Sequence, residues 1–339
     1  MKKSSTIYDI AERLGFSAST VSRALANNPR ISLKTRKLVM KEAGKIGYNR
    51  NKYASNLRRG KGETIGVIVP RINRSFFASV IHGIEEELYK KNYNLIICQS
   101  KELLSREQQC VRLLIDSSVD GIIYSASAET ASFDHICSII NARIPLVQFD
   151  RVLRELSTNS VINDNDNGAY KATMHLIEQG YKKIAHLHGP LNLSVYQERK
   201  SGYELAMNEA GLEVKKDWVL PAITEMAGRE AAEKLLSMKD RPDAIFCASD
   251  FSALGSLKEA KDKGVCVPKD LGVVGFANEP FCEMIHPGLT SVEQFSESIG
   301  RESAKMVLDQ INHKSSDQPV QIRSCSVELK VRESSLKNR

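Results

Sequence analysis

Apolar and polar residues follow two different spacings along this chain of 339 residues. In residues 6–46 the apolar residues recur every three or four positions, which is typical of amphipathic helices. From residue 64 onward they form short uninterrupted runs, which is typical of strands buried on both faces of a parallel sheet. The pattern therefore predicts a small all-α unit followed by a larger α/β part.

The all-α part begins with two short helices joined by a tight turn. Four apolar residues form the inner face of the first helix: Ile7, Ile10, Ala11 and Leu14. Gly15 ends this helix, because glycine takes a positive φ without steric cost. Ser17 can cap a second helix, whose inner face holds three apolar residues, Val21, Ala24 and Leu25. Two helices in this arrangement make a helix-turn-helix.

The outward face of the second helix suits contact with DNA. It carries small or hydrogen-bonding side chains and one arginine: Ala18, Ser19, Ser22, Arg23 and Ala26. Such a face can approach base edges in a major groove. A third helix, capped by Ser32 and ended by Gly47, would complete a three-helix core with four apolar residues, Leu38, Val39, Ala43 and Ile46.

Charge supports the same interpretation. Residues 1–61 contain fifteen Lys or Arg and three acidic residues, an excess of twelve positive charges. Because the whole chain carries +7, the remaining residues sum to 7 − 12 = −5. Positive charge confined to one end is what neutralisation of DNA phosphates requires, and a uniformly basic surface would not show it.

Residues 48–60, YNRNKYASNLRRG, allow two interpretations. The segment is too polar for a core element, yet Ala54 and Leu57 lie three positions apart and give one helical turn a small apolar edge. It is either a flexible basic linker or a short hinge helix that folds only on DNA, with Leu57 inserted between base steps of the minor groove. The residues alone leave both open.

The rest of the chain alternates strands with helices. Runs of β-forming residues occur at 64–70, 94–100, 121–127, 144–150, 183–190, 243–250 and 270–278. Helical patterns separate most of them, at about 77–91, 106–118, 134–142, 167–179, 197–210, 227–238, 252–263 and 295–313. This order indicates βαβ units and parallel sheets. Seven or more βαβ units are more than one open sheet usually holds. We therefore predict two doubly wound subdomains with a cleft between them.

Polar residues cluster where several of these strands end. Asp150-Arg151, Ser249-Asp250 and Asn278-Glu279 each follow a strand, and Arg199 lies on a later helix. Ligands of doubly wound folds bind beyond the carboxyl ends of the strands. A carboxylate beside a guanidinium can bind vicinal hydroxyls, and Phe76-Phe77 could stack on the apolar face of a sugar. The sequence therefore predicts a small-molecule site in the cleft.

Catalytic and metal sites find little support. The chain has no G-x-G-x-x-G, Walker, G-x-S-x-G or H-E-x-x-H motif. His186 and His188 would share one face of a strand, but no third ligand follows nearby, so histidines with structural partners are the favoured interpretation. Seven cysteines without a C-x-x-C pair indicate reduced thiols. We expect no enzyme, no metal and no cofactor.

Targeting signals are also missing from the pattern. No run of about 18 apolar residues could span a membrane. The opening MKKSS resembles the start of a signal peptide, but Asp9, Glu12 and Arg13 stand where its apolar region would be. We therefore expect a cytoplasmic protein without membrane partners.

These residues resemble the lactose/galactose-repressor (LacI/GalR) family of transcription regulators. The resemblance runs from TIYDIAERLGFSASTVSRALANNPR through TIGVIVP, QFDRV, HLHGP, ERKSGY, FCASDFSALG and VVGFANEP to PGLTSVEQ, and so covers essentially the whole chain. It implies a homodimer or larger assembly on a pseudo-palindromic double-stranded DNA operator. It also implies a core similar to periplasmic binding proteins, whose cleft takes a small effector such as a sugar.

On this basis the chain divides into five parts. We expect a helix-turn-helix headpiece at 1–48, a hinge helix or linker at 49–61 and a tail at 333–339. The core N-subdomain would comprise 62–162 and 293–321, and the core C-subdomain 163–292 and 322–332. The predicted fold class is an all-α headpiece plus an α/β core of two doubly wound parallel-sheet subdomains.

The resemblance also assigns candidate site residues. Ala18, Ser19 and Arg23 match positions that contact bases, Thr6 and Ser22 suit phosphate contact, and Ala54 and Leu57 match the minor-groove hinge. The full DNA-binding set is Thr6, Ser17, Ala18, Ser19, Thr20, Ser22, Arg23, Asn27, Ala54 and Leu57. The effector-binding set is Phe76, Phe77, Asp150, Arg199, Ser249, Asp250 and Asn278.

Two departures from the family pattern concern the effector. The family's G-[FY]-D-[DN] is here Gly275-Phe276-Ala277-Asn278, which lacks a carboxylate expected to bind ligand, and its N-D pair is Ser249-Asp250. We predict a DNA-binding repressor of transcription whose operator affinity is switched by a small molecule. The small molecule that we expect is a carbohydrate. The alternative is a cytoplasmic sugar-binding protein or sugar-metabolising enzyme with an incidental basic amino terminus.

Overall fold

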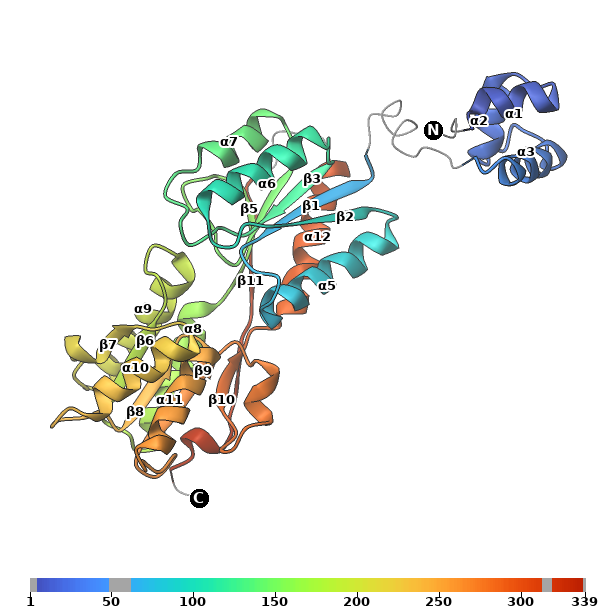
Figure 1. Ribbon diagram of the computed structural model, residues 1–339. Coiled ribbons are helices and arrows are strands. Elements are labelled where there is room, and N and C mark those ends of the chain that lie inside the picture. The colour runs from blue at the N-terminus through green and yellow to red at the C-terminus, as the bar shows by residue number, and fades with distance from the viewer. Residues whose placement is uncertain (1–4, 49–61, 313–318, 338–339) are drawn as a thin grey trace. The chain divides into compact units, whose positions relative to one another are not determined.

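The structure is a computed structural model that describes residues 5–48, 62–312 and 319–337 (Figure 1). The chain divides into two compact units between Gly62 and Glu63. No helix in the described part of the chain is long and apolar enough to cross a membrane.

The first unit is a headpiece of three helices, α1 (Ile7–Leu14), α2 (Ala18–Leu25) and α3 (Leu33–Lys45). Hydroxyl side chains cap all three at the amino end, because Thr6, Ser17 and Ser32 accept hydrogen bonds from the backbone three residues later. Gly15 follows α1 with φ 67°, which confirms the predicted turn. The core is small and consists of Ile10, Ala11, Val21, Ala24, Val39 and Ala43.

One residue that the sequence predicted for the headpiece core is exposed instead. Leu38 was expected on the inner face of α3, but its side chain is 46% exposed. Val39 and Ala43, four positions apart, already fill the space between α3 and the other two helices. Leu38 precedes Val39 by one position and so points to a different side of the helix.

The second unit contains two six-stranded sheets within the described residues. The first sheet has the order β11-β5-β4-β3-β1-β2, and all its pairs are parallel. Its strands are β1 (Thr64–Val69), β2 (Asn94–Gln99), β3 (Gly121–Tyr124), β4 (Leu146–Phe149), β5 (Asn159–Asn163) and β11 (Ile322–Cys325). The helices of this first lobe are α5 (Ser75–Lys90), α6 (Leu104–Asp116), α7 (Asp134–Asn141) and α12 (Ser296–Asn312).

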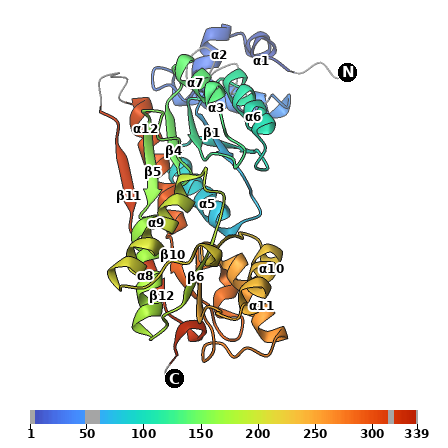
Figure 2. The same cartoon turned by 90° about the vertical axis from the view of Figure 1, so that its left-hand side faces the viewer.

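Helices cover both faces of this sheet. One face packs on α5 and α12, and the other packs on α6 and α7 (Figures 1 and 2). β1 shows why its sequence is a continuous apolar run: Ile65 and Val67 face α5 and α12, and Ile68 faces α6. α12 approaches α5 closely because Gly300 leaves room, and a Cβ there would lie 2.1 Å from the Val80 carbonyl oxygen.

The second sheet has the order β12-β10-β9-β8-β6-β7. Its strands are β6 (Ile184–His188), β7 (Val219–Pro221), β8 (Ala244–Cys247), β9 (Gly272–Phe276), β10 (Thr290–Glu293) and β12 (Glu328–Lys330). β12 alone among the described strands of this sheet pairs antiparallel, with β10. The second lobe has α8 (Asn165–Glu178) and α9 (Ser194–Glu209) on one face and α10 (Glu225–Leu236) and α11 (Asp250–Asp262) on the other. The predicted fold class is confirmed.

The chain passes between the two lobes three times in the described residues: after β5, after β10 and after β11. Residues 322–325 were expected in the second lobe, but they form β11, which pairs with β5 in the first sheet. The last passage therefore lies between Cys325 and Glu328. The sequence of this edge strand could not show the difference, because β11 and β12 are short and no helix separates them.

Hydrogen bonds tie the passages together. Asn163 Nδ2 donates to the Gln294 carbonyl oxygen at 2.9 Å, and Gln294 Nε2 donates back to Asn163 Oδ1 at 3.0 Å. The backbone N–H of Asp164 donates to the Cys325 carbonyl oxygen at 3.1 Å. Because the three segments are linked, a change in the angle between the lobes must move all of them together.

Candidate DNA-binding surface and effector pocket

The outward face of α2 carries the side chains that the sequence predicted for DNA contact. Ser17, Ser19 and Arg23 are exposed, whereas Ala18, Thr20 and Ser22 are half-buried at the edge of the headpiece core. Arg23 folds back along its own helix: Nε donates to the Ser19 carbonyl oxygen at 3.2 Å, and Nη2 donates to Ser19 Oγ at 3.3 Å. The guanidinium is therefore held over the outer face of α2, with its remaining N–H groups open to a base edge.

The other predicted DNA contacts have structural partners as well. Thr6 Oγ1 donates to Asp9 Oδ2 at 2.9 Å and accepts from the Asp9 N–H, so it caps α1. Asn27, exposed and with φ 54°, accepts a hydrogen bond from Arg36. Ala54 and Leu57 lie outside the described residues.

A pocket of about 370 Å³ lies between the two lobes of the core. The first lobe contributes the start of α5 and the end of β4, and the second lobe contributes α9, the start of α11 and the end of β9. Five of the seven predicted effector residues line it: Phe76, Phe77, Asp150, Arg199 and Ser249. The prediction of a cleft at the strand ends thus agrees with the described core.

Arg199 of the second lobe and Asp150 of the first lobe lie on opposite sides of this pocket. Arg199 on α9 is only 6% exposed, and it donates from Nε to Asn165 Oδ1 at 3.0 Å and from Nη1 to the Ala248 carbonyl oxygen at 2.8 Å. Asp150 follows β4 with φ 56°. Burial raises the pKa of the Asp150 carboxyl, although Arg151 and Arg199 act in the opposite direction.

Aromatic rings give the pocket its apolar walls. Phe76 and Phe77 begin α5 and meet edge to face, with ring centroids 5.1 Å apart. Phe77 is anchored in the first lobe against Phe149. On the other side, the Arg199 guanidinium lies over the Phe276 ring. The guanidinium carbon is 3.7 Å from the centroid of that ring. Polar groups between aromatic faces are typical of sites for small polar ligands.

Two predicted effector residues, Asp250 and Asn278, do not line the pocket. Asp250 starts α11 but is fully buried, and its carboxylate accepts hydrogen bonds from Ser291 Oγ at 2.6 Å and from the Glu279 N–H at 2.8 Å. Asn278 donates from Nδ2 to Glu293 Oε2 at 2.8 Å. Both side chains hold the strand-end loops of the second lobe together, so the structure places these two predicted effector residues outside the pocket lining.

Sequence reasoning also missed several lining residues. The missed polar and aromatic side chains are Arg71, Arg74, Glu102, Arg151, Tyr196, Thr224, Phe251, Phe276, Glu279 and Gln294. Arg151 and Glu279 are the second members of the strand-end pairs already singled out, and Tyr196 lies one helical turn before Arg199, so all three positions carried a signal. Arg71 and Arg74 lie between the end of β1 and α5 in a segment without a motif.

Ala277 lines the pocket, and its backbone φ is 120°. Residues other than glycine rarely adopt this conformation. We expect the Ala277→Gly variant to raise the free energy of unfolding by about 1 kcal/mol, because glycine adopts a positive φ without strain. Urea unfolding measures the change. The control is Ala78→Gly on the exposed side of α5, where glycine should cost about 0.5–1 kcal/mol. Equal destabilisation by both variants would contradict the strain.

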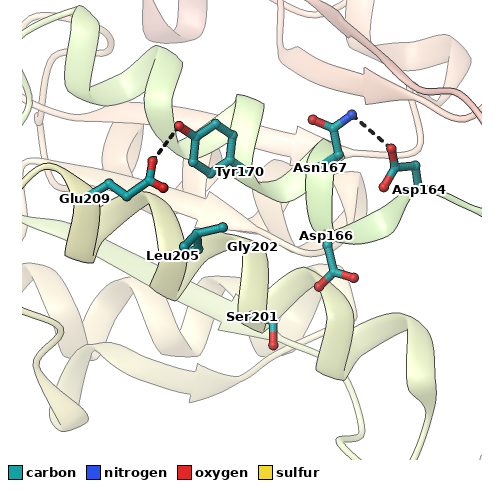
Figure 3. A pocket seen from close by; sticks show the side chains of 8 residues that line it. All are labelled: Asp164, Asp166, Asn167, Tyr170, Ser201, Gly202, Leu205 and Glu209. Carbon is teal, nitrogen blue, oxygen red and sulfur yellow. Dashed lines mark hydrogen bonds between the residues drawn. The ribbon is translucent and has the colours of Figure 1, made fainter.

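A second hollow, of about 550 Å³, lies on the surface between α8 and α9 (Figure 3). Three carboxylates surround it, and two of them already have partners, since Tyr170 donates to Glu209 and Asn167 donates to Asp164 (Figure 3). Burial and the neighbouring acids Glu198 and Asp164 raise the pKa of the third, Asp166. None of the predicted site residues lines this hollow, and the smaller pocket between the lobes is the better effector site.

The histidine pair agrees with a structural role. His186 is stacked between the rings of Tyr203 and Phe246, and its Nδ1 lies 3.1 Å from the Phe246 carbonyl oxygen. Burial lowers the pKa of His186 to about 3, so the ring is neutral. Among the described residues, one group of three metal-type ligands comes together elsewhere, at His82, Glu86 and Glu297, where Arg301 binds both carboxylates.

Comparison with known proteins agrees with both parts of the chain. Residues 6–51 match the family of bacterial regulatory proteins of the lacI type, and residues 62–331 match the family of periplasmic binding proteins and sugar-binding domains of the LacI family. The chain is 33% identical to catabolite control protein A of Priestia megaterium over 317 residues, which cover 93% of this chain and 95% of the relative.

Solved structures show the same architecture. The structure of the transcriptional regulator CelR in complex with cellobiose is 27% identical and superposes with a TM-score of 0.75, covering 97% of this chain and 99% of that one. The Lac repressor dimer bound to operator and an anti-inducer, at 23% identity and a TM-score of 0.87, covers 98% and 100% and shares the fold.

These matches decide between the two functions that the sequence left open. The relatives are regulators, so the alternative of a sugar-binding protein or enzyme with an incidental basic end is set aside. A helix-turn-helix headpiece, a two-lobed core with a pocket between the lobes and the family matches lead to one conclusion. The chain belongs to the LacI family and is an effector-regulated, DNA-binding regulator of transcription.

Proposed function

We propose that this regulator is a repressor whose effector is a carbohydrate bound between the two lobes of the core. The observation that carries the proposal is the meeting of Asp150, Arg199 and the rings of Phe76, Phe77 and Phe276 around one pocket. A carboxylate and a guanidinium can bind vicinal hydroxyls, and aromatic rings can cover the apolar face of a sugar. The complex of CelR with cellobiose supports a ligand of this class.

In this proposal α2 contacts the operator in the major groove. Ala18, Ser19 and Arg23 contact bases, and Thr6 and Ser22 contact phosphates, with Ser17, Thr20 and Asn27 at the edges of the same surface. A single headpiece covers one half-site, so a homodimer on a pseudo-palindromic operator satisfies the geometry. Such a protein works where the chromosome is, in the cytoplasm.

The effector would act on the operator through the three passages between the lobes. Gln294 lines the pocket and exchanges two hydrogen bonds with Asn163 at the first passage. A ligand that contacts Gln294 can therefore change the angle between the lobes. The thermodynamic measure of this link is a coupling free energy between pocket and operator, typically about 1–3 kcal/mol.

Exchanging Arg23 for alanine should weaken binding to the specific operator about 5- to 150-fold, or about 1–3 kcal/mol, and leave non-specific affinity nearly unchanged. The reason is that its guanidinium is exposed on α2 and positioned by Ser19. An operator selected from random DNA with the unaltered protein, followed by fluorescence anisotropy, measures both affinities. Lys41→Ala, exposed on α3, is the control and should affect both DNAs equally. Equal losses for Arg23→Ala on both DNAs would refute base contact.

The carbohydrate class is tested on the full chain. A thermal-shift screen of monosaccharides and disaccharides, with nucleobases as the contrasting class, should show stabilisation by sugars alone, because a ligand of the folded state raises the melting temperature by mass action. The best sugar should also change operator affinity by about 5- to 150-fold. Stabilisation by nucleobases and by none of the sugars would refute the proposal.

A further inference from the structure

We propose that the effector is an anionic carbohydrate, a sugar with a carboxylate or phosphate group, and that Arg74 binds its negative group. This inference rests on the proposed carbohydrate effector and specifies its charge. It comes from a difference in ion pairing among the four arginines that line the pocket, Arg71, Arg74, Arg151 and Arg199. Two of them share a carboxylate of the protein, and two do not.

Arg71 and Arg151 are paired. Nη1 of Arg151 lies 2.7 Å from Glu102 Oε2, and Nε of Arg71 lies 3.4 Å from Glu102 Oε1. Arg151 Nε is also 3.9 Å from Asp150 Oδ2. On this side of the pocket two guanidinium groups face two carboxylates, so a further anion would gain nothing.

Arg74 has no such partner within the described residues. It immediately precedes α5 in the first lobe, and its guanidinium carbon lies 3.9 Å from the centroid of the Phe251 ring on α11 of the second lobe. The contact with the ring positions the guanidinium but leaves its five N–H donors for other groups. Arg74 is half-buried in the pocket wall, where a charge without a counter-ion is costly.

Arg199 adds a second cation of the same kind. Its two hydrogen bonds go to neutral oxygens, those of Asn165 and Ala248, and no carboxylate in the described core lies within ion-pair distance of it. It is stacked on Phe276 as Arg74 is stacked on Phe251. Two guanidinium groups on aromatic rings thus line one pocket without a carboxylate partner. An anionic ligand group matches guanidinium geometry through two parallel hydrogen bonds.

The amino termini of two helices also favour an anion in this pocket. α5 and α9 are each sixteen residues long, and neither has a side-chain cap, since their capping positions are Arg74 and Leu193. Their first turns line the pocket through Phe76, Phe77, Val195 and Tyr196. The positive end of the helix dipole favours an anion at such a place.

The remaining acid does not cancel this charge. Glu279 lines the pocket and accepts a hydrogen bond from the Ser75 hydroxyl across the lobes. Four arginines against Glu102, Asp150 and Glu279 leave the lining with a net charge of +1. Burial also raises the pKa of Asp150, which weakens its contribution as an anion.

The experiment compares neutral sugars with their charged counterparts on the full chain by isothermal titration calorimetry at fixed ionic strength. The probes are glucose, glucuronate and glucose 6-phosphate, and galactose, galacturonate and galactose 1-phosphate. We expect one anionic sugar to bind at least about tenfold more tightly than its neutral counterpart. The uronate and phosphate arms show which group is bound.

Variants assign the preference to Arg74. Arg74→Gln should abolish it, Arg74→Lys should retain part of it, and Arg112→Gln, exposed on α6 away from the pocket, should leave it intact. Tighter or equal binding of a neutral sugar overturns the inference and leaves the carbohydrate effector standing. A preference that survives in Arg74→Gln overturns it as well. If none of the six probes binds and no sugar of the thermal-shift screen stabilises the protein, the carbohydrate effector itself is refuted.

Discussion

The Ile10→Ala variant is expected to lose its folded headpiece and, with it, operator binding. Ile10 is fully buried in a core of only six buried apolar residues. Truncation of a buried Ile to Ala costs about 2–5 kcal/mol. A unit of this length has a total stability of roughly 2–7 kcal/mol at about 0.05–0.15 kcal/mol per residue, so the loss leaves little or nothing.

Amide hydrogen exchange in residues 5–48 measures the loss directly, and fluorescence anisotropy with operator DNA measures its consequence. The core, a separate compact unit, should keep its unfolding transition and its ligand binding. Met40→Ala on α3, where the side chain is 54% exposed, is the control and should change stability by less than about 0.5 kcal/mol. A protected headpiece in Ile10→Ala would show that the three helices do not depend on this core.

Replacing Asp250 by asparagine should change how the stability of the core depends on pH. Burial raises the pKa of the Asp250 carboxyl to about 6, against the hydrogen bonds from Ser291 and the Glu279 N–H, which act in the opposite direction. The unfolded chain releases this proton near pH 4. Between about pH 4 and pH 6 the folded state therefore holds more protons, and its stability from this group is lost as the pH rises.

The expected size is about 3 kcal/mol, since each pKa unit corresponds to about 1.4 kcal/mol. Asparagine does not titrate, so the unfolding free energy of Asp250→Asn relative to the unaltered protein should rise by this amount from pH 4 to pH 7. Urea unfolding at several pH values measures it. Asp309→Asn, exposed on α12, is the control for the exchange of a carboxylate for an amide at the surface. A flat difference for Asp250→Asn would mean that the carboxyl is ionised at little cost.

Local patterns predicted most of the fold. The apolar runs of β1, β3, β4, β8 and β9 are long enough to distinguish strands buried between two helical layers, and glycine and hydroxyl side chains marked the ends of α1 and α2. Five strands escaped prediction, because each has only three to five residues and polar residues or proline interrupt its apolar ones: β5, β7, β10, β11 and β12. Their pairing partners are set by tertiary contacts.

The pocket was predictable in place but less so in detail. Position after a strand predicted Asp150 and Ser249, which line the pocket, and also Asp250 and Asn278, which do not. The reason is that adjacent residues of a strand-end loop point in different directions, and the loop needs some of its polar groups to satisfy its own backbone. Asp250 accepts the Glu279 N–H for that purpose. Arg74 carried no signal, because its neighbour Phe251 lies far along the chain, across the lobes.

The return of α12 and β11 to the first lobe also bears on how the protein forms during translation. The headpiece is complete after fewer than fifty residues and can fold while the ribosome is still making the core. The first lobe must wait, because α12 covers one face of its sheet and β11 closes its edge, and both are made after the whole of β6 to β10. A nascent chain can therefore hold a finished DNA-binding module before it has a pocket with which to control it.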